Sequence, residues 1–263
     1  MIDNIIIGQY FKNDSFVHRL DPRTKIILNV IYIFGIFFTN TLKGYLIYFL
    51  LVFFISIASK IKFYHLLKAI KTISLFIIFT SLFNIFLIRD GEIIFKFAFI
   101  EIYDKAILTS LFISLRVIFL IIGSTILTLT TSPVELTDGF EFLMSPLRKF
   151  KIPVSEISLM ISISLRFIPT LLDETDKIIK AQKSRGVDFE SGSIFKRVKN
   201  IVPILIPLFV NSFRRADELA IAMESRCFQS SEERFKFRVL KFSKNDFISF
   251  FVFTIVVILI SFI

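Results

Sequence analysis

The sequence has few of the residues from which catalytic and metal sites are built, and this narrows the functions open to it. It contains two histidines, His18 and His65, and one cysteine, Cys227, none of which has metal-ligand spacing with another. None of the eight glycines is followed by lysine, so the sequence has no P-loop for ATP. A single cysteine also excludes an intramolecular disulfide. We therefore expect a non-catalytic protein that holds no metal ion or cofactor.

What the chain does contain is apolar. Hydrophobic residues make up 54% of its 263 residues, 35 of them are phenylalanine, and the mean hydropathy is +0.73. This composition predicts a membrane protein. Charged residues still make up 21%, so a large part of the chain must lie at or outside the membrane surface. The formal charge of +10 fits basic flanks beside anionic lipid better than nucleic acid, because the chain is so apolar.

Five segments are apolar enough to cross a bilayer as helices. The first segment has clear helix-start signals, because Asp21 can cap it and Pro22 suits the first helical position. The fourth is interrupted by Arg116. The chain has no tryptophan, so tyrosines at span ends must anchor it at the interface. The five predicted spans are residues 25–39, 44–59, 72–88, 106–130 and 247–263.

Lysine and arginine in the short connections predict the orientation. Basic residues precede the first span and follow the second, whereas the connection over 89–105 mixes both charges. We therefore expect a cytoplasmic N-terminus in the cell's inner or cytoplasmic membrane. Asp3 and Asp14 flank the first apolar run where a cleaved signal peptide would be basic, so we expect no such signal.

The region from 132 to 245 is predicted to lie on the cytoplasmic side, between membrane regions at 1–131 and 246–263. Residues 133–150 are typical of a short amphipathic helix that ends near Pro146. Residues 153–186 and 192–228 each predict a long helix with an apolar first half and a charged second half. We expect the first long helix to be capped at Ser155 and bent at Pro169. The predicted fold is thus an all-α membrane protein with about five transmembrane helices and long amphipathic cytoplasmic coupling helices.

Both long helices end in a similar sequence, "AQKSRG" (181–186) and "AMESRC" (222–227). One interpretation is that each arginine only complements the negative end of a helix dipole, with Gly186 as an ordinary stop. The other is that each tip presents an arginine that forms forked hydrogen bonds in a partner's groove. The duplication on two helices of one design favours the second interpretation and indicates two equivalent partner subunits.

These residues and several longer motifs resemble a known family. The chain is similar over nearly its whole length to the transmembrane T component (EcfT/CbiQ) of energy-coupling factor (ECF) transporters. The motifs, in the family's order, are "HRLDPRTK" (18–25), "TTSPVEL" (130–136), "SPLRKFKIPVSEISLMISISLRFIPTLLDE" (145–174), "AQKSRG" (181–186) and "PLFVNSFRRADELAIAMESRCF" (207–228).

The resemblance implies a scaffold subunit of an ECF-type ABC importer. In that family, two X-Arg-X motifs dock into two ABC ATPase subunits, and the membrane part holds a substrate-binding S component for a vitamin or transition metal ion. The motifs implied here are Ser184, Arg185 and Gly186 on one helix, and Ser225, Arg226 and Cys227 on the other. Cys227 departs from the family's glycine, and because a left-handed turn costs more for cysteine, we expect the second helix end to close differently.

Some alternatives stay open. A membrane scaffold or assembly factor that never binds ATPases is one, and a conventional ABC permease is another, although it leaves two matched tips unexplained. Arg116 either faces a carboxylate inside the bundle or marks a kink, and Arg166 is expected to play a structural role near the headgroups. Glu174 either pairs with a cation of a neighbouring helix or lies on a surface. The sequence specifies neither the substrate nor whether the two ATPases are identical.

Overall fold

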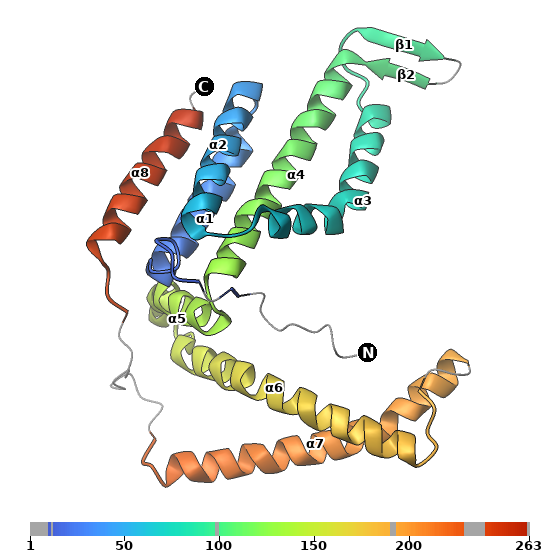
Figure 1. The fold of residues 1–263 in the computed structure, drawn as a ribbon, viewed down its shortest axis with the longest axis vertical. Coiled ribbons are helices and arrows are strands. Elements are labelled where there is room, and N and C mark those ends of the chain that lie inside the picture. Colours follow the sequence, from blue (N-terminus) through green and yellow to red (C-terminus); the bar gives the residue numbers. More distant parts are fainter. Residues whose placement is uncertain (1–9, 12, 98–99, 190–192, 229–239, 262–263) are drawn as a thin grey trace. The chain divides into compact units, whose positions relative to one another are not determined.

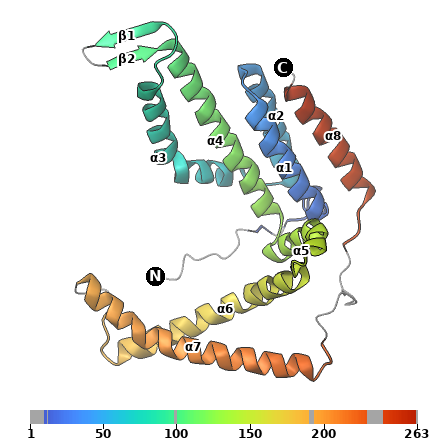
Figure 2. The same ribbon diagram turned by 180° about the vertical axis from the view of Figure 1, so that it is seen from behind.

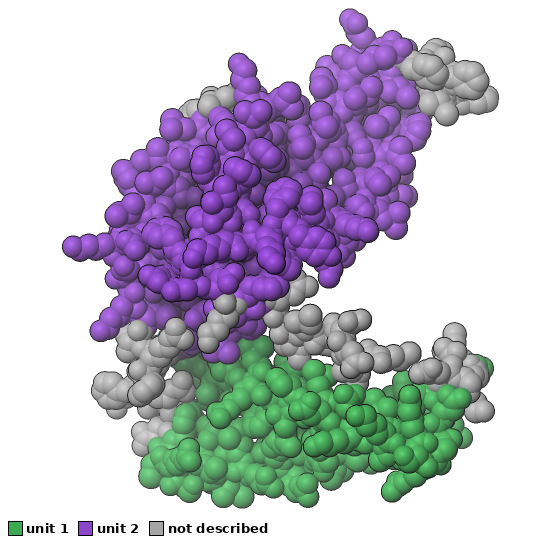
Figure 3. Space-filling model, in the orientation of Figure 1, with its two compact units in different colours: residues 1–6, 143–239 green, residues 7–142, 240–263 purple. Residues whose placement is uncertain are grey.

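The structure is a computed structural model that describes residues 10–11, 13–97, 100–189, 193–228 and 240–261. The chain divides into two compact units, shown in Figure 3. Unit 2 is drawn from residues 7–142 and 240–263, and unit 1 is drawn mainly from residues 143–239. The polypeptide therefore leaves unit 2 once, builds unit 1, and returns to unit 2 for its last helix.

Unit 2 is a helical bundle with a small hairpin. Four helices, α1, α2, α4 and α8, run side by side, and α3 lies on the other side of α4 from α8 (Figures 1 and 2). Its strands β1 and β2 form an antiparallel pair with an irregularity between Ile93 and Phe95. The elements are α1 (Pro22–Phe38), α2 (Leu42–Ser59), α3 (Phe63–Leu87), β1 (Ile93–Phe97), β2 (Ile100–Tyr103), α4 (Asp104–Thr130), α5 (Pro133–Met144) and α8 (Lys244–Ser261).

Local sequence explains where several of these helices begin. The Asp21 carboxylate accepts a hydrogen bond from the Arg23 N–H, and Pro22 occupies the first helical position of α1, as predicted. At α5, Ser132 and Glu135 form reciprocal side-chain to backbone bonds of 3.3 Å, which is a capping box. In a bilayer such caps matter more than in water, because no solvent can satisfy the first N–H groups.

The core of unit 2 joins α1, α2 and α4 through aromatic side chains. Tyr32 and Tyr48 are buried and meet edge to face at 5.6 Å between ring centroids. The Tyr32 hydroxyl donates to the Phe119 carbonyl at 3.0 Å, so this buried polar group is satisfied. Tyr45 of α2 stacks on Phe112 of α4. These contacts hold three predicted spans together by packing, as expected where the hydrophobic effect between helices is weak.

Unit 1 consists of two crossing helices and the short segment before them. The elements are a 3-10 helix (Ser145–Phe150), α6 (Val154–Ser184) and α7 (Ile194–Glu224), which cross in Figure 1. The predicted cap of α6 at Ser155 is wrong, because Pro153 occupies the cap position and makes no side-chain cap bond. The Ser155 hydroxyl instead accepts a 2.7 Å bond from Arg148. Both α6 and α7 continue through internal prolines, namely Pro169, Pro203 and Pro207.

The predicted all-α membrane class is confirmed, with two differences in detail. Four described helices are long and apolar enough to cross a membrane, namely α2, α3, α4 and α6. Helices α1 and α8 occupy the first and last predicted spans. Helix α3 begins at Phe63 rather than near residue 72, because the basic connection after α2 is itself helical. The β hairpin was not predicted; it is a two-stranded element without a core of its own.

A buried polar cluster fixes the place where the chain leaves and re-enters unit 2. The Asp246 carboxylate is 2% exposed and accepts bonds from the Asp21 N–H at 2.8 Å and the Ser243 N–H at 2.7 Å. The Arg23 guanidinium lies 3.7 Å from the ring centroid of Phe142 and donates to the Leu240 carbonyl at 3.3 Å. We call Asp21, Arg23, Phe142, Leu240 and Asp246 the entry cluster. It joins the start of α1, the end of α5 and the approach to α8.

The entry cluster predicts a specific stability effect. Asp246→Asn keeps the size of the side chain but offers only one acceptor oxygen to two N–H groups, of which that of Asp21 is buried. Since a buried unsatisfied donor costs about 1–3 kcal/mol, we expect the melting temperature of the detergent-purified chain to fall by roughly 3–10 °C. Asn245→Ala, at the exposed neighbouring position, is the control and should change little. An unchanged melting temperature for Asp246→Asn would show that the cluster does not hold the helix ends.

Candidate functional site

The two arginine-bearing helix ends close in the same way. After α6, the Gly186 N–H donates to the Lys183 carbonyl at 3.0 Å, and the Val187 N–H donates to the Gln182 carbonyl at 3.1 Å. This pair of bonds is a Schellman motif, in which a left-handed residue turns the chain back over the last carbonyls. Gly186 supplies that residue with φ 85°. A side chain there would meet nothing within 4 Å, so backbone conformation, rather than space, favours glycine.

The second end shows that the expected difference at Cys227 is wrong. The Cys227 N–H donates to the Glu224 carbonyl and the Phe228 N–H to the Met223 carbonyl, both at 2.9 Å. Cys227 adopts φ 53°, so it occupies the left-handed position that Gly186 occupies at the first end. The two bonds to otherwise unpaired carbonyls offset the cost that the cysteine Cβ adds in this conformation. Both tips therefore close with the same Schellman motif, despite the cysteine.

The side chains of the two tips are also disposed alike. Arg185 and Arg226 are both exposed, and neither guanidinium makes a hydrogen bond or ion pair within the described part of the chain. The hydroxyls of Ser184 and Ser225 donate to carbonyls of their own helices, Lys180 and Ala222, each at 3.1 Å. The serines therefore finish the helix ends, while the arginines remain available to a partner.

The structure does not bring the two tips together. Helices α6 and α7 cross, and their C-terminal ends point to opposite ends of the crossed pair (Figures 1 and 2). Both tips nevertheless belong to unit 1, so they are parts of one compact body. An arrangement of this kind suits two separate contacts with a partner rather than one shared pocket.

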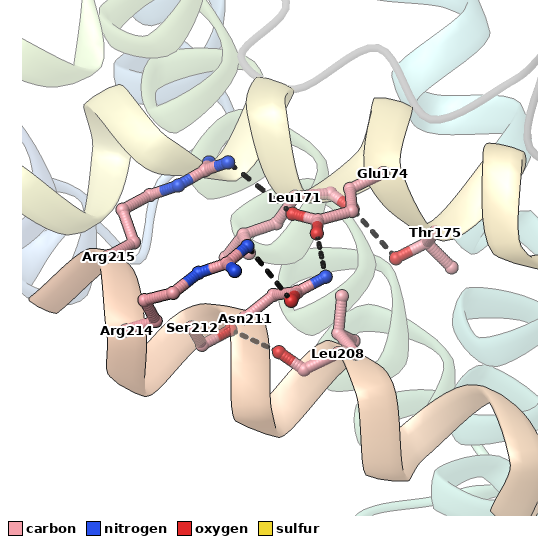
Figure 4. A network of polar contacts seen from close by, with 8 residues as sticks. All are labelled: Leu171, Glu174, Thr175, Leu208, Asn211, Ser212, Arg214 and Arg215. Atoms are coloured by element: carbon pink, nitrogen blue, oxygen red, sulfur yellow. Dashed lines mark hydrogen bonds and ion pairs between the residues drawn. The ribbon is translucent and has the colours of Figure 1, made fainter.

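Glu174 of α6 fastens the crossing to α7. Its two carboxylate oxygens accept bonds from the Asn211 amide and, at 3.5 Å, from Arg215 Nη2 (Figure 4). Arg215 also lies over the ring of Phe167 on α6, 5.8 Å from its centroid. We call Glu174, Asn211 and Arg215 the crossing clamp. Of the two interpretations of Glu174, pairing with a neighbouring helix is therefore the one the structure supports.

Sequence reasoning missed Asn211, because only the neighbouring helix makes it part of a site. Asn211 and Arg215 are four residues apart and so share a face of α7. From the clamp, Arg185 lies about 16 Å along α6 and Arg226 about 20 Å along α7, at about 1.5 Å per residue. The tips are thus carried on two helical arms of similar length that meet at one polar contact.

The two other arginines in apolar surroundings have different roles. Arg116 donates from Nη2 to the Asn40 side chain at 3.0 Å and to the Thr39 carbonyl at 3.4 Å. It therefore binds the end of α1 and the turn that follows, a role that neither sequence interpretation proposed. Arg166 is exposed on α6, and its expected place near the headgroups stays a prediction.

Comparisons with known proteins cover both tips, the crossing clamp and most of unit 2. The model of a family described as cobalt transport protein (CbiQ) matches residues 13–237. The chain belongs to the CbiQ family. A member from Clostridium kluyveri is 48% identical over 250 residues, covering 95% of this chain and 93% of the relative. A member from Bacillus subtilis is 48% identical over 246 residues, covering 94% of this chain and 93% of the relative. A member from Staphylococcus aureus is 46% identical over 249 residues, covering 95% of this chain and 93% of the relative.

All three relatives are named energy-coupling factor transporter transmembrane protein EcfT. Membership of the CbiQ family together with several long apolar helices makes the chain a multi-pass membrane protein. Within the described residues, no group of three histidine, cysteine or carboxylate side chains is placed to hold a metal ion. In this CbiQ family member, the residues that stand out chemically are the two exposed arginine tips.

The closure of the tips predicts opposite effects of two substitutions. Cys227→Gly removes the strain of a left-handed non-glycine residue, while Gly186→Ala introduces it, each by about 1 kcal/mol. Since about 1 kcal/mol is roughly a fivefold change in a local equilibrium, the Phe228 amide should exchange about fivefold more slowly in Cys227→Gly. The Val187 amide should exchange about fivefold faster in Gly186→Ala. Hydrogen exchange by mass spectrometry measures both, and equal exchange in all three proteins would contradict the shared motif.

The crossing clamp predicts a loss of rigidity when its carboxylate is removed. Glu174→Leu leaves the Asn211 amide and Arg215 without their acceptor, a cost of about 1–3 kcal/mol. We expect a broader distance distribution between spin labels on α6 and α7, placed at Lys180 and Ile221 in a Cys227→Ser background. Asp173→Leu changes the exposed neighbour and serves as the control. Identical distributions in Glu174→Leu and Asp173→Leu would show that the clamp does not fix the crossing.

Proposed function

We propose that this chain is the transmembrane coupling subunit of an ECF-type ABC importer. In this role it transmits ATP hydrolysis by two ATPase subunits to a substrate-binding S component, for uptake of a vitamin or transition metal ion. The observation that carries the proposal is the pair of exposed arginines on two helix ends of identical backbone closure, held in one compact unit. The names of the relatives, which place them in energy-coupling factor transporters, support it.

Docking at the tips follows from the chemistry of arginine. Its planar guanidinium offers five N–H donors and stays charged at every physiological pH, so it suits carboxylates and carbonyls in a groove. Each tip stands clear of its own helix, since the preceding serine bonds to that helix and the chain then turns away. Two such tips at opposite ends of a crossed pair can reach two ATPase subunits at once (Figure 1).

Transmission follows from the crossing. When two ATPases move toward each other on binding ATP, the docked ends of α6 and α7 move with them. Because Glu174 ties the helices where they cross, displacement of the tips changes the angle between the helices rather than sliding them past each other. The S component responds only if the changed surface binds one of its states better than another, which is the energetic condition for any such coupling.

The same proposal places the coupling region on the cytoplasmic side, with the N-terminus. ATP is available there, and the basic flanks of the first two spans favour that orientation. The domain boundaries predicted at 132 and 245 stay a prediction; unit 1 runs mainly over 143–239, so α5 belongs to unit 2. In the proposed assembly, unit 2 is the membrane region and unit 1 carries the coupling helices.

Docking is tested by removing the guanidinium groups. Arg185→Ala and Arg226→Ala each delete charge-assisted hydrogen bonds of about 1.5–3 kcal/mol, so each should weaken binding of the ATPases about tenfold or more. The double variant should lose the ATPases on co-purification and should abolish substrate uptake. Lys177→Ala, an exposed cation on α6, is the control. Full assembly and uptake in the double variant would favour a scaffold that does not bind ATPases.

A further inference from the structure

A cavity of about 560 Å³ opens between four helices of unit 2. It forms because α1 and α2 each pack on α4 and α8 but make little contact with each other. Tyr32 of α1 and Tyr48 of α2 are in contact, and the cavity lies where the two helices are further apart. The walls are almost wholly apolar, formed mainly by Leu28, Leu51, Ile55, Ile126, Val252 and Phe253. Its volume lies within the range of small-molecule sites.

Polar groups gather at one end of this cavity. Lys25 and Asn29 lie one turn apart near the start of α1, Thr130 is the last residue of α4, and Ser249 lies in the second turn of α8. Lys25 Nζ donates to the carbonyls of His18 at 3.1 Å and Thr130 at 3.0 Å. An ammonium group has three donors, so one remains. The cavity is therefore amphipathic along its length, with a polar end and an apolar body.

Two of these polar groups have no protein partner in the described residues. Neither the Asn29 amide nor the Ser249 hydroxyl makes a hydrogen bond there, although both line the cavity. Polar groups among hydrocarbon are costly when unpaired, and side chains in membrane helices usually bond across to a neighbour. Both side chains are partly buried, so their polar groups are available to a molecule that enters the cavity.

We propose that this cavity binds one membrane phospholipid. One acyl chain lies along the wall between α1 and α2, and the ester and headgroup region accepts hydrogen bonds from Asn29, Ser249 and Lys25. A phospholipid fits both parts of the cavity, since its apolar chain continues directly into polar acceptors and the surrounding bilayer supplies it. The bound chain would fill the space that α1 and α2 leave open next to the entry cluster. This site does not depend on the proposed transport function.

Filling the cavity tests the acyl-chain part. Ala58 and Ile57 are both exposed on α2, but only Ala58 lines the cavity. We expect native mass spectrometry of the full chain in mild detergent to show one retained phospholipid, and Ala58→Phe to reduce retention about tenfold. Ile57→Phe introduces the same side chain on the outer face and should retain the lipid. Equal retention in Ala58→Phe and Ile57→Phe, or no retained lipid in the wild type, would overturn the proposal.

Removing the amide tests the polar part. Asn29→Leu keeps the cavity apolar but deletes the unpaired amide, and Val30→Leu is the control at an exposed position outside the cavity. Delipidated protein titrated with dioleoyl phosphatidylglycerol should rise in melting temperature, because a ligand that binds only the folded state stabilises it. The rise should shrink in Asn29→Leu and persist in Val30→Leu. A rise that is equal in both variants would overturn the placement of the lipid's polar part at Asn29.

Discussion

The burial of Asp246 and Arg23 in one place is the constraint on which the arrangement of unit 2 depends. Asp246 is 2% exposed and Arg23 is 8% exposed, so both are charges that would be costly without partners. Asp246 accepts from the N–H of Asp21. Arg23 donates to the carbonyl of Leu240, lies over the ring of Phe142 and has its Nε 3.7 Å from the Asp21 carboxylate. Because these partners come from α1, α5 and the approach to α8, the cluster forms only when all three are in place. It thereby fixes the two points at which the chain leaves unit 2 and re-enters it.

Unit 1 relies on a second polar contact of a different kind. The crossing clamp is partly exposed, with Glu174 and Arg215 side chains 20% and 33% accessible, so its net contribution to stability is smaller than that of a buried network. The clamp matters mainly because it fixes where the two helices cross. Glu174 uses one oxygen for Asn211 and the other for Arg215, and two bonds to residues one turn apart fix both position and direction. Two long helices joined at such a point can change their angle while keeping their crossing position.

The sequence predicted those features that depend on neighbouring residues. The cap at Asp21, the short helix that begins at residue 133, and the course of the long helices follow from local spacing and were confirmed. Features that depend on distant residues were missed or wrong. Ser155 looks like a cap but bonds to Arg148, and Arg116 binds the turn after α1.

Asn211 carried no special pattern, since an asparagine becomes part of a site only when another helix brings a carboxylate to it. The backbone of Cys227 was also mispredicted, because residue propensity gave the cost of a left-handed turn but not the two hydrogen bonds that offset it. At both sites the conformation or role of the residue depends on hydrogen bonds to other residues, which its intrinsic propensity does not include.

Because the two tips close with the same motif, the difference between them lies in their side chains rather than in their backbone. Since Gly186 and Cys227 both adopt the left-handed turn, the backbone presents Arg185 and Arg226 in the same way. The difference lies two residues before each arginine, where the matching positions carry Lys183 and Glu224. A groove whose acidic rim attracts Lys183 beside Arg185 would repel Glu224 beside Arg226. Charges at a rim select between partners more than they add affinity. Under the proposed function, two different ATPase subunits, each with its own rim charge, match these tips better than one subunit used twice.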